Sequence, residues 1–483
     1  MTKKSFKQLI KNSKCISLFV SFSFLFAVNL FAQKDELKTD SIKTSVAAST
    51  IDSVKEKAPA SEPFAFGDFT WLNGNNRQAS NILDNKFFSA DFTFDLNYTK
   101  SNRNPIDNTV VGSTALTRNN EFTVSFVGIG GDFHWNNVRG RFMTQFGTRS
   151  TVIPRNDFST YRGQYDLPDA YRYISEAYGG YHFNKWHGIN LDFGIFMSYI
   201  GLFSYNNFEN WGYQPSFTSD NTPWFFNGMR LQMFPTDKLK IEFWLINGWQ
   251  SYAKFNKMPG LGFSVLYRPK EDISMISNNY FGTDVQGFAN AKRYHTDDSF
   301  EKRYYNKPKS SRFIKRAAFS LTGDFGVQSG GPYTPFGDTT ASNFISGMAY
   351  NRIWFGKDMH WAWTIGGGFI HNPSRYLVLV PPGQATDKFL NDATPASKFD
   401  GWDASTTLDY MPNDFITIRT EVVTRHSSIP YFAGHGGVTS ATGYQVAPQG
   451  SSNSNSYTPQ DPNFTPDLVK SELRGIFAII VRF

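Results

Sequence analysis

Apolar and polar residues alternate without a break in the stretch FSADFTFDLNY, residues 88–98. Because successive side chains of a β-strand point to opposite sides, this pattern predicts a strand with one apolar face and one polar face. The same period of two recurs at residues 138–146, 189–195, 239–245 and 402–410. The chain is therefore predicted to contain many long, two-faced strands.

The length of these strands indicates which face points outward. Residues 88–98 at 3.3 Å each span roughly 36 Å, and a tilt near 45° reduces this to about 26 Å, close to the apolar band of an outer-membrane barrel. The polar faces carry full charges, such as Arg139 with Arg141 and Lys240 with Glu242. In lipid, each Arg or Lys near the midplane would cost roughly 2–4 kcal/mol. We therefore expect the apolar face to point outward; a secreted soluble all-β protein is the alternative.

The connections between the predicted strands are of two alternating kinds. Short turns rich in turn-forming residues lie at 136–137, 184–188, 235–238, 268–272, 356–358 and 411–414. Long polar stretches lie at about 99–119, 150–171, 201–223, 282–296, 329–341, 371–400 and 427–469. This asymmetry is typical of an outer-membrane barrel. The predicted fold is all-β, a transmembrane antiparallel β-barrel of about 16 strands; 14 or 18 also fit, because the pair around 297–327 is unclear.

The N-terminus predicts export from the cytoplasm. Five lysines precede an apolar run from Cys15 to Val28, and Ala32 offers a cut site, which is typical of a secretory signal peptide; a membrane anchor is the alternative. We expect a signal peptide over 1–32, a flexible periplasmic extension over 33–63, an aromatic and Asn-rich segment over 64–86 and the barrel over 87–483. The expected location is the cell outer membrane, with a periplasmic N-terminus.

Composition changes this picture in three ways. The formal charge of +7 falls to +2 without the five signal lysines, so we expect no nucleic-acid partner. Cys15 is the only cysteine, which excludes disulfides in a mature chain. Aromatic residues make up 17% of a chain whose mean hydropathy is −0.40, and membrane interfaces concentrate such rings.

The last strand, SELRGIFAIIVRF, ends on Phe483, and an aromatic C-terminal residue resembles the signal read by the barrel-insertion machinery. The chain as a whole resembles the outer-membrane β-barrel porin family of the OmpL-like type, found in Gram-negative bacteria. The resemblance is carried by FGDFTWLNGNNRQ (66–78), FSADFTFDLNY (88–98), Asn210-Trp211, INGW (246–249), YHTDDS (294–299), AAFSLTGDFG (317–326) and Phe483. It implies a porin-like barrel and names no substrate.

Function is expected to lie in the lumen of the barrel. Alternation assigns twelve charged residues to the pore lining: Asp91, Asp95, Arg139, Arg141, Arg149, Asp192, Arg230, Lys240, Glu242, Arg419, Glu421 and Arg425. Three arginines (139, 141 and 149) are predicted to share one strand, where they could favour anions; cross-strand pairing of the interior charges is the alternative. The long loop 201–223 is predicted either to fold inward, with Glu209, Asn210 and Trp211 as constriction candidates, or to pack over the mouth of the barrel.

The sequence offers little support for catalysis or cofactors. His295 in YHTDDS and His426 before two serines look like turn or rim residues, and no histidine pair has zinc-ligand spacing. The predicted function is passive diffusion of small hydrophilic solutes or ions through a porin with no cofactor and no enzyme activity. The alternatives are a plugged or non-conducting barrel acting as a surface adhesin or receptor, and an outer-membrane hydrolase. The expected partners are outer-membrane lipid, the insertion machinery and the solutes, and a homotrimer fits the chain length.

Overall fold

The computed structural model describes residues 62–78, 81–155, 157, 165–285, 287–330, 342–373, 376, 399–444 and 464–483. The chain divides into two compact units, residues 1–59 and 60–483, and the described residues all belong to the second. The predicted signal peptide and most of the predicted extension therefore lie outside the described residues.

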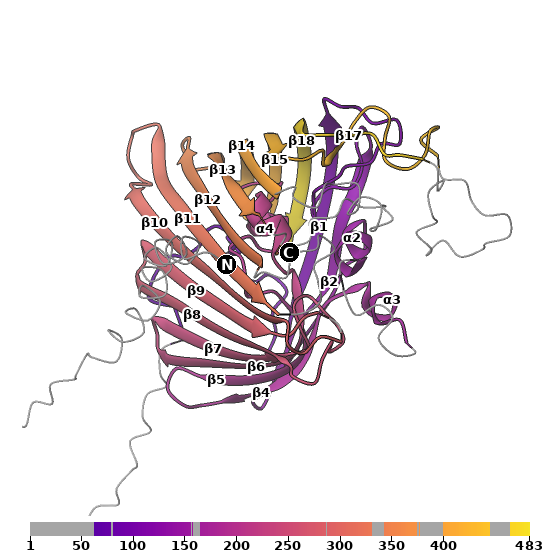
Figure 1. Ribbon diagram of the computed structural model, residues 1–483. Helices are drawn as coiled ribbons and strands as arrows, with labels where there is room; N and C mark the ends of the chain where they lie inside the picture. Colours follow the sequence, from indigo (N-terminus) through magenta and orange to yellow (C-terminus); the bar gives the residue numbers. More distant parts are fainter. Residues whose placement is uncertain are drawn as a thin grey trace, which may run out of the picture. The chain divides into compact units, whose positions relative to one another are not determined.

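Sixteen strands close into one antiparallel barrel, in which β1 pairs with both β2 and β18 (Figure 1). The strands are β1 (Phe88–Ser101), β2 (Phe122–Trp135), β3 (Val138–Thr144), β4 (Ile174–Phe183), β5 (Ile189–Met197), β6 (Phe225–Thr236), β7 (Leu239–Ile246), β8 (Gly260–Lys270), β9 (Ile273–Gly282), β10 (Lys292–Asn306), β11 (Ile314–Ser329), β12 (Ser342–Phe355), β13 (Trp361–Asn372), β14 (Phe399–Asn413), β15 (Ile416–Ser427) and β18 (Ser471–Arg482). The predicted fold class and strand number are confirmed.

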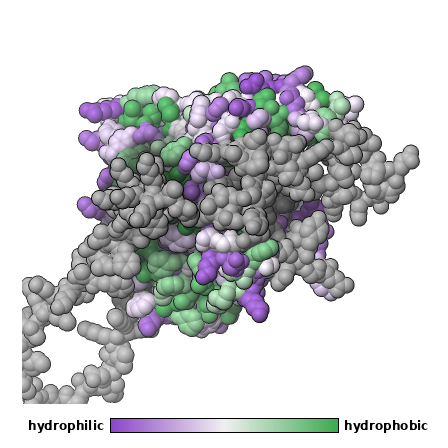
Figure 2. Space-filling model, viewed as in Figure 1, coloured by the Kyte–Doolittle hydropathy of each residue, from purple (hydrophilic) through white to green (hydrophobic). Residues whose placement is uncertain are grey.

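The apolar faces of the strands point away from the barrel interior. Along β14 the residues alternate, so that Asp403 and Asp409 are buried while Trp402 is 47% exposed and Leu408 is 41% exposed. Figure 2 shows hydrophobic residues gathered over the lower part of the barrel, where Figure 1 places β4 to β7. A barrel with its large apolar side chains outside and its charges inside fits a membrane rather than water.

Short turns and long loops are sorted to opposite ends of the barrel, as predicted. We call these the turn end, where β2–β3 and the other short hairpins close, and the loop end. Asn136 and Asn137 form a two-residue turn with positive φ angles of 46° and 70°, as a type I′ hairpin turn requires. Two details of the prediction are wrong: β10 begins at Lys292, inside the predicted loop 282–296, and the connection 247–259 was not among the predicted long loops.

Short elements occupy several loops: α2 (Arg149–Arg155), α3 (Leu167–Tyr171), the 3-10 turn η1 (Asn207–Glu209), α4 (Phe217–Asn221) and the small pair β16 (Phe432–Ala433) and β17 (Leu468–Val469). The prediction that Arg149 shares a strand with Arg139 and Arg141 is wrong. Strand β3 ends at Thr144, and Gly147 turns the chain with φ +104°, where a Cβ would lie 2.7 Å from the Ser125 carbonyl oxygen. Arg149 therefore begins α2. Of the helices within the described residues, none has the length and apolar character to cross a membrane.

Candidate functional site

Eleven of the twelve predicted pore-lining residues lie on inner strand faces, and most of them form ion pairs. Arg139 on β3 and Arg230 on β6 both contact Asp192 on β5, at 3.2 and 2.8 Å, while Lys240 lies 2.8 Å from Glu242 within β7. Cross-strand pairing therefore accounts for many of the interior charges, the alternative to a free basic strip. Arg149, the twelfth residue, contacts Tyr205 and Asn207 of a loop rather than a strand.

The loop between β5 and β6, residues 198–224, runs inside the ring of strands, and we call it the inserted loop. Its helix α4 lies within the ring in Figure 1 and contacts β12, β13 and β14. Because its backbone is irregular, its N–H and C=O groups need partners other than a sheet ladder. Charged side chains on the inner faces of the barrel strands supply those partners.

Arg419 on β15 is the main donor to the inserted loop. Its guanidinium donates to three loop carbonyl oxygens, those of Asn207 at 3.2 Å, Gly212 at 2.9 Å and Asn210 at 2.6 Å. It also pairs with Asp409 on β14 at 2.7 Å. Five donors in a planar fork allow one arginine to hold both a carboxylate and a turn of backbone.

Carboxylates on the barrel wall accept from the same loop. Glu421 accepts the backbone N–H groups of Tyr213, at 2.6 Å, and Gln214, at 2.9 Å. The Tyr213 hydroxyl donates to Asp95 at 2.7 Å. Burial, and the nearby Asp95 carboxylate after it, raise the pKa of Tyr213 well above its ordinary value, so the phenol stays a donor at neutral pH.

Helix α4 is fixed in the same way. Asp403 on β14 accepts the Phe217 N–H at 2.8 Å, at the start of the helix, and Asp220 lies 3.0 Å from Arg425 on β15. The first N–H groups of a helix have no partner within it, so a carboxylate there satisfies them. The inserted loop is thus anchored along most of its length to one side of the lumen.

Residues 62–78 form a second piece of chain inside the barrel, at the turn end, and we call them the lumen segment. The indole N–H of Trp71 donates to the Glu271 carbonyl at 2.9 Å, in the β8–β9 turn. Asn73 accepts the Trp211 N–H at 2.7 Å, and the indole of Trp211 donates to the Trp71 carbonyl at 3.1 Å. Trp71 and Trp211 belong to one buried apolar cluster with Trp354 of β12. The lumen segment and the inserted loop therefore pack against each other.

Two features fix the lumen segment in place. Gly74 has φ +71°, and a Cβ there would lie 1.9 Å from the Leu202 carbonyl oxygen, so only glycine fits this approach. Asp68 contacts Arg316 at 3.0 Å and Arg303 at 3.2 Å. Burial raises the pKa of Asp68, but the Thr70 hydrogen bonds and the two guanidinium groups outweigh it, so that pKa lies below its ordinary value.

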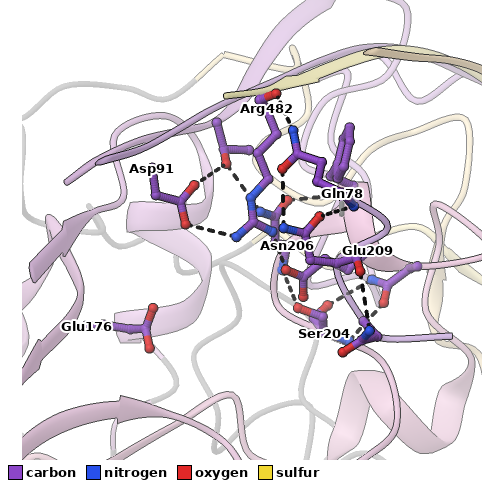
Figure 3. A network of polar contacts seen from close by, with 12 residues as sticks. Gln78, Asp91, Glu176, Ser204, Asn206, Glu209 and Arg482 are labelled. Atoms are coloured by element: carbon purple, nitrogen blue, oxygen red, sulfur yellow. Dashed lines mark hydrogen bonds and ion pairs between the residues drawn. The ribbon is translucent and has the colours of Figure 1, made fainter. Parts of the chain in front are cut away.

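The edge of the inserted loop meets the barrel wall in a charged group that we call the edge network, shown in part in Figure 3. Arg482 on β18 pairs with Glu209 of the loop and donates to Asp91 on β1 at 2.9 Å. Arg141 on β3 donates to the same Asp91 oxygen at 2.9 Å. Arg141 also contacts Asp132 at 2.7 Å and Glu176 at 2.6 Å. Four carboxylates therefore share two arginines.

The structure separates the three constriction candidates. Glu209 lies at the edge network with 16% of its side chain exposed. Asn210 and Trp211 are buried, at 2% and 3% exposure, and hold the loop to itself and to the lumen segment. Sequence reasoning missed Arg482, Asp132 and Glu176. Alternation along β18 and β2 could have indicated that Arg482 and Asp132 point inward. It could not have indicated that these side chains belong to one charged network.

A cavity of about 840 Å³ opens between the lumen segment, the inserted loop and the β12–β13 and β14–β15 turns. Its charged lining residues are Asp68, Arg77, Glu209, Arg268, Arg316, Arg352, Asp358, Asp414 and Arg419. Arg268 lies 4.8 Å from the ring centre of Phe64 and 4.6 Å from that of Phe69. No hydrogen bond or ion pair joins its guanidinium to another described residue.

The two histidines singled out from the sequence lie in different surroundings. The interpretation of His295 as a turn or rim residue is wrong, since it lies within β10, fully buried, 3.3 Å from Asp324 and against the Trp249 ring. His426 lies 2.7 Å from the Ser471 hydroxyl near the loop end of β15. Within the described ranges, no group of three His, Cys, Asp or Glu residues could hold a metal ion.

Similar folds occur among solved outer-membrane proteins. The anion-selective porin from Comamonas acidovorans is 9% identical, with 82% of this chain and 99% of that chain covered and a TM-score of 0.46. OprB from Pseudomonas putida is 8% identical, with 82% and 94% covered and a TM-score of 0.47. The channel DcaP from Acinetobacter baumannii is 12% identical, with 85% and 100% covered and a TM-score of 0.43. At these values the likeness carries no argument about solutes.

No curated protein sequence matches the chain. A family model does match, over residues 92–448, most of the described barrel. Its description is "Putative beta-barrel porin-2, OmpL-like", which agrees with the closed sixteen-strand barrel and its apolar outer face. The chain belongs to this family of OmpL-like β-barrel porins, and it is an outer-membrane channel protein.

Proposed function

We propose that small hydrophilic solutes cross the barrel by passive diffusion past the edge network, and that this path favours cations. The observation that carries the proposal is the sharing of Arg141 among three carboxylates. With Glu209 and Arg482 included, the edge network holds four carboxylates and two arginines, a formal charge of −2. A ring of net charge selects ions through the local potential.

The anchoring of the inserted loop supports this route. The loop is held by β1, β12, β14, β15 and β18, and the lumen segment packs beneath it, which leaves the polar residues of β3 to β7 on the other side of the lumen. Asp132, on β2 beside them, has half of its side chain exposed. An exposed carboxylate attracts cations from solution, whereas the paired Arg141 offers anions little free charge.

Orientation and assembly complete the proposal. We place the turn end in the periplasm, because long loops of such barrels face outside and short turns face inside. This puts the lumen segment and its cavity at the periplasmic exit, and the N-terminal extension in the periplasm. A homotrimer remains our expectation from the chain length, and Phe483 remains the expected insertion signal.

The reversal potential in a potassium chloride gradient tests the preference for cations. We expect a cation-selective wild-type channel, and a selectivity at least halved in the double variant Asp132→Asn, Glu176→Gln. The matched control is Glu121→Gln, which removes a carboxylate that pairs with Arg118 in a loop, away from the edge network. An anion-selective wild type, or an unchanged double variant, would contradict the route.

A further inference from the structure

The outer wall of β9 and β10 carries polar side chains where an outer-membrane barrel normally presents apolar ones. On β10 the odd positions face the lumen, since Arg303 contacts Asp68 of the lumen segment and Glu301 accepts the Asn73 N–H. The even positions, Thr296 and Asp298, therefore lie on the outer face, where Thr296 is buried at 6% exposure and Asp298 is half-buried. Their partners across the β9–β10 pair are Asn279 and Ser277. We call these four residues, Ser277, Asn279, Thr296 and Asp298, the outer polar patch.

The outer polar patch lies at the depth of the membrane, not at its edge. Asp298 is the seventh residue of a strand of 15. The opposite wall of the barrel differs: β1 and β2 present Phe94, Leu96 and Ile129 outward, each between 37% and 42% exposed. Hydrocarbon offers no hydrogen-bond partner, so a carboxylate and an amide facing acyl chains are unfavourable at this depth.

Two glycines stand in one row of the sheet beside the patch. Gly323 on β11 stands opposite Asp298, and Gly347 on β12 stands opposite Gly323. These two glycines carry no side chain, and the ring of Phe369 lies against Gly347, where a Cβ would come 3.0 Å from it. Small residues in such a position let two membrane-spanning surfaces approach closely.

We propose that the outer face of β9 to β12 is the contact surface for a second copy of this chain in the same membrane. Two copies insert in the same direction, so their patches lie at the same depth, and a symmetry axis along the membrane normal brings them together. Within one copy, two acceptors of the patch already have donors. Asp298 accepts a hydrogen bond from Thr296 at 3.2 Å, and the oxygen of the Asn279 side chain accepts from Tyr294 at 2.8 Å.

The remaining hydrogen-bond donor of the patch, on the Asn279 side chain, also favours a second copy as the partner. The side-chain N–H₂ of Asn279 has no hydrogen bond to any described residue, and a carboxylate such as Asp298 of a second copy would satisfy it. A buried, charge-assisted hydrogen bond of this kind is stronger than one between neutral groups. Lipid would leave the N–H₂ group of Asn279 without a partner, and Asp298 with only the hydroxyl groups of its own chain. This inference does not depend on which solute the channel carries.

Disulfide cross-linking in intact outer membranes is the first test, because Cys15 is the only cysteine of the chain. We expect oxidation of Ser277→Cys to convert most of the protein to a covalent dimer on a denaturing gel. The control Ile129→Cys on the opposite wall should stay monomeric. Equal yields from the two variants, or no dimer from either, would overturn the proposal.

The second test is the molar mass of the folded protein in detergent, by sedimentation. We expect the wild type to sediment as a multimer, and Ser277→Trp and Asp298→Leu to weaken association at least tenfold, with Ile129→Trp unchanged. A heat-modifiable band on a gel confirms that each variant is folded. A wild type that is monomeric, or an Asp298→Leu variant that is as multimeric as the wild type, would show that the patch faces lipid instead.

Discussion

Replacement of Arg419 by glutamine should loosen the inserted loop without unfolding the barrel. The substitution removes three hydrogen bonds to loop carbonyl oxygens, at 2.6, 2.9 and 3.2 Å, and one ion pair to Asp409. Asp409 keeps a partner, because Arg352 lies 2.7 Å away. The loss therefore falls on the loop rather than on an orphaned carboxylate.

The size of the effect follows from these contacts. Arg419 is 1% exposed, and a hydrogen bond to a charged group contributes about 1.5–3 kcal/mol. Because Arg352 still compensates Asp409, we take a loss of about 3 kcal/mol for the loop. Glu421 and Asp95 still hold Tyr213, so the change is confined to the part of the loop around η1. At about 1.4 kcal/mol for each factor of ten, the released state of this part becomes on the order of a hundredfold more populated than in the wild type.

Single-channel recording detects this change. We expect Arg419→Gln to open in steps of similar size but with more current noise and more frequent brief sublevels, because η1 carries Glu209 at the edge network. Arg118→Gln, which removes a half-exposed arginine from another loop, is the control. If the folded Arg419→Gln channel has the same step size and noise as the wild type, the inserted loop does not narrow the path.

Three further predictions concern the lumen segment and the C-terminus. The pKa of Asp68 lies below its ordinary value of 3.8, so its stabilising contribution is present above that pH and is lost as the pH falls through the lowered value. Protection of the amides of residues 62–78, relative to the intrinsic exchange rate at each pH, should therefore fall in acid, and Asp68→Asn should remove that fall. Gly74→Ala should lower the melting temperature by several degrees, because the new Cβ would meet the Leu202 carbonyl oxygen. The control Gly287→Ala also has a positive φ, but its Cβ would have no atom within 4 Å, so it should lower the melting temperature less. Equal shifts in the two variants would contradict the close approach at Gly74. Deletion of Phe483 should lower the folded yield in the outer membrane, and an unchanged yield would remove its role as the insertion signal.

Much of the barrel could be predicted because its strands are long and strictly two-faced. The predicted stretches 88–98, 239–245 and 402–410 fall within β1, β7 and β14. The pattern failed at β10, where Thr296 and Asp298 are polar on the outer face and His295 and Asp297 are polar on the inner face. With both faces polar, the period of two is lost, and the same feature motivates the contact surface proposed above.

The site was less predictable because its contacts join distant parts of the chain. Arg419 lies 209 residues from Asn210, and Asp91 lies 391 residues from Arg482. Alternation indicates that a side chain points inward but not which residue it contacts. The predicted basic strip is therefore replaced in the structure by ion pairs. The predicted strand was also too long, because Phe146 continues the alternation of Phe142 and Thr144. Strand β3 in fact ends at Thr144, before Arg149.

The most direct test of the account is the single-channel conductance of the purified protein in a planar bilayer under a salt gradient. We expect stable steps from a water-filled path, with a reversal potential that indicates a preference for cations past the edge network. A folded barrel that gives no steps at any voltage would contradict it, and would mean that the inserted loop and the lumen segment together close the barrel.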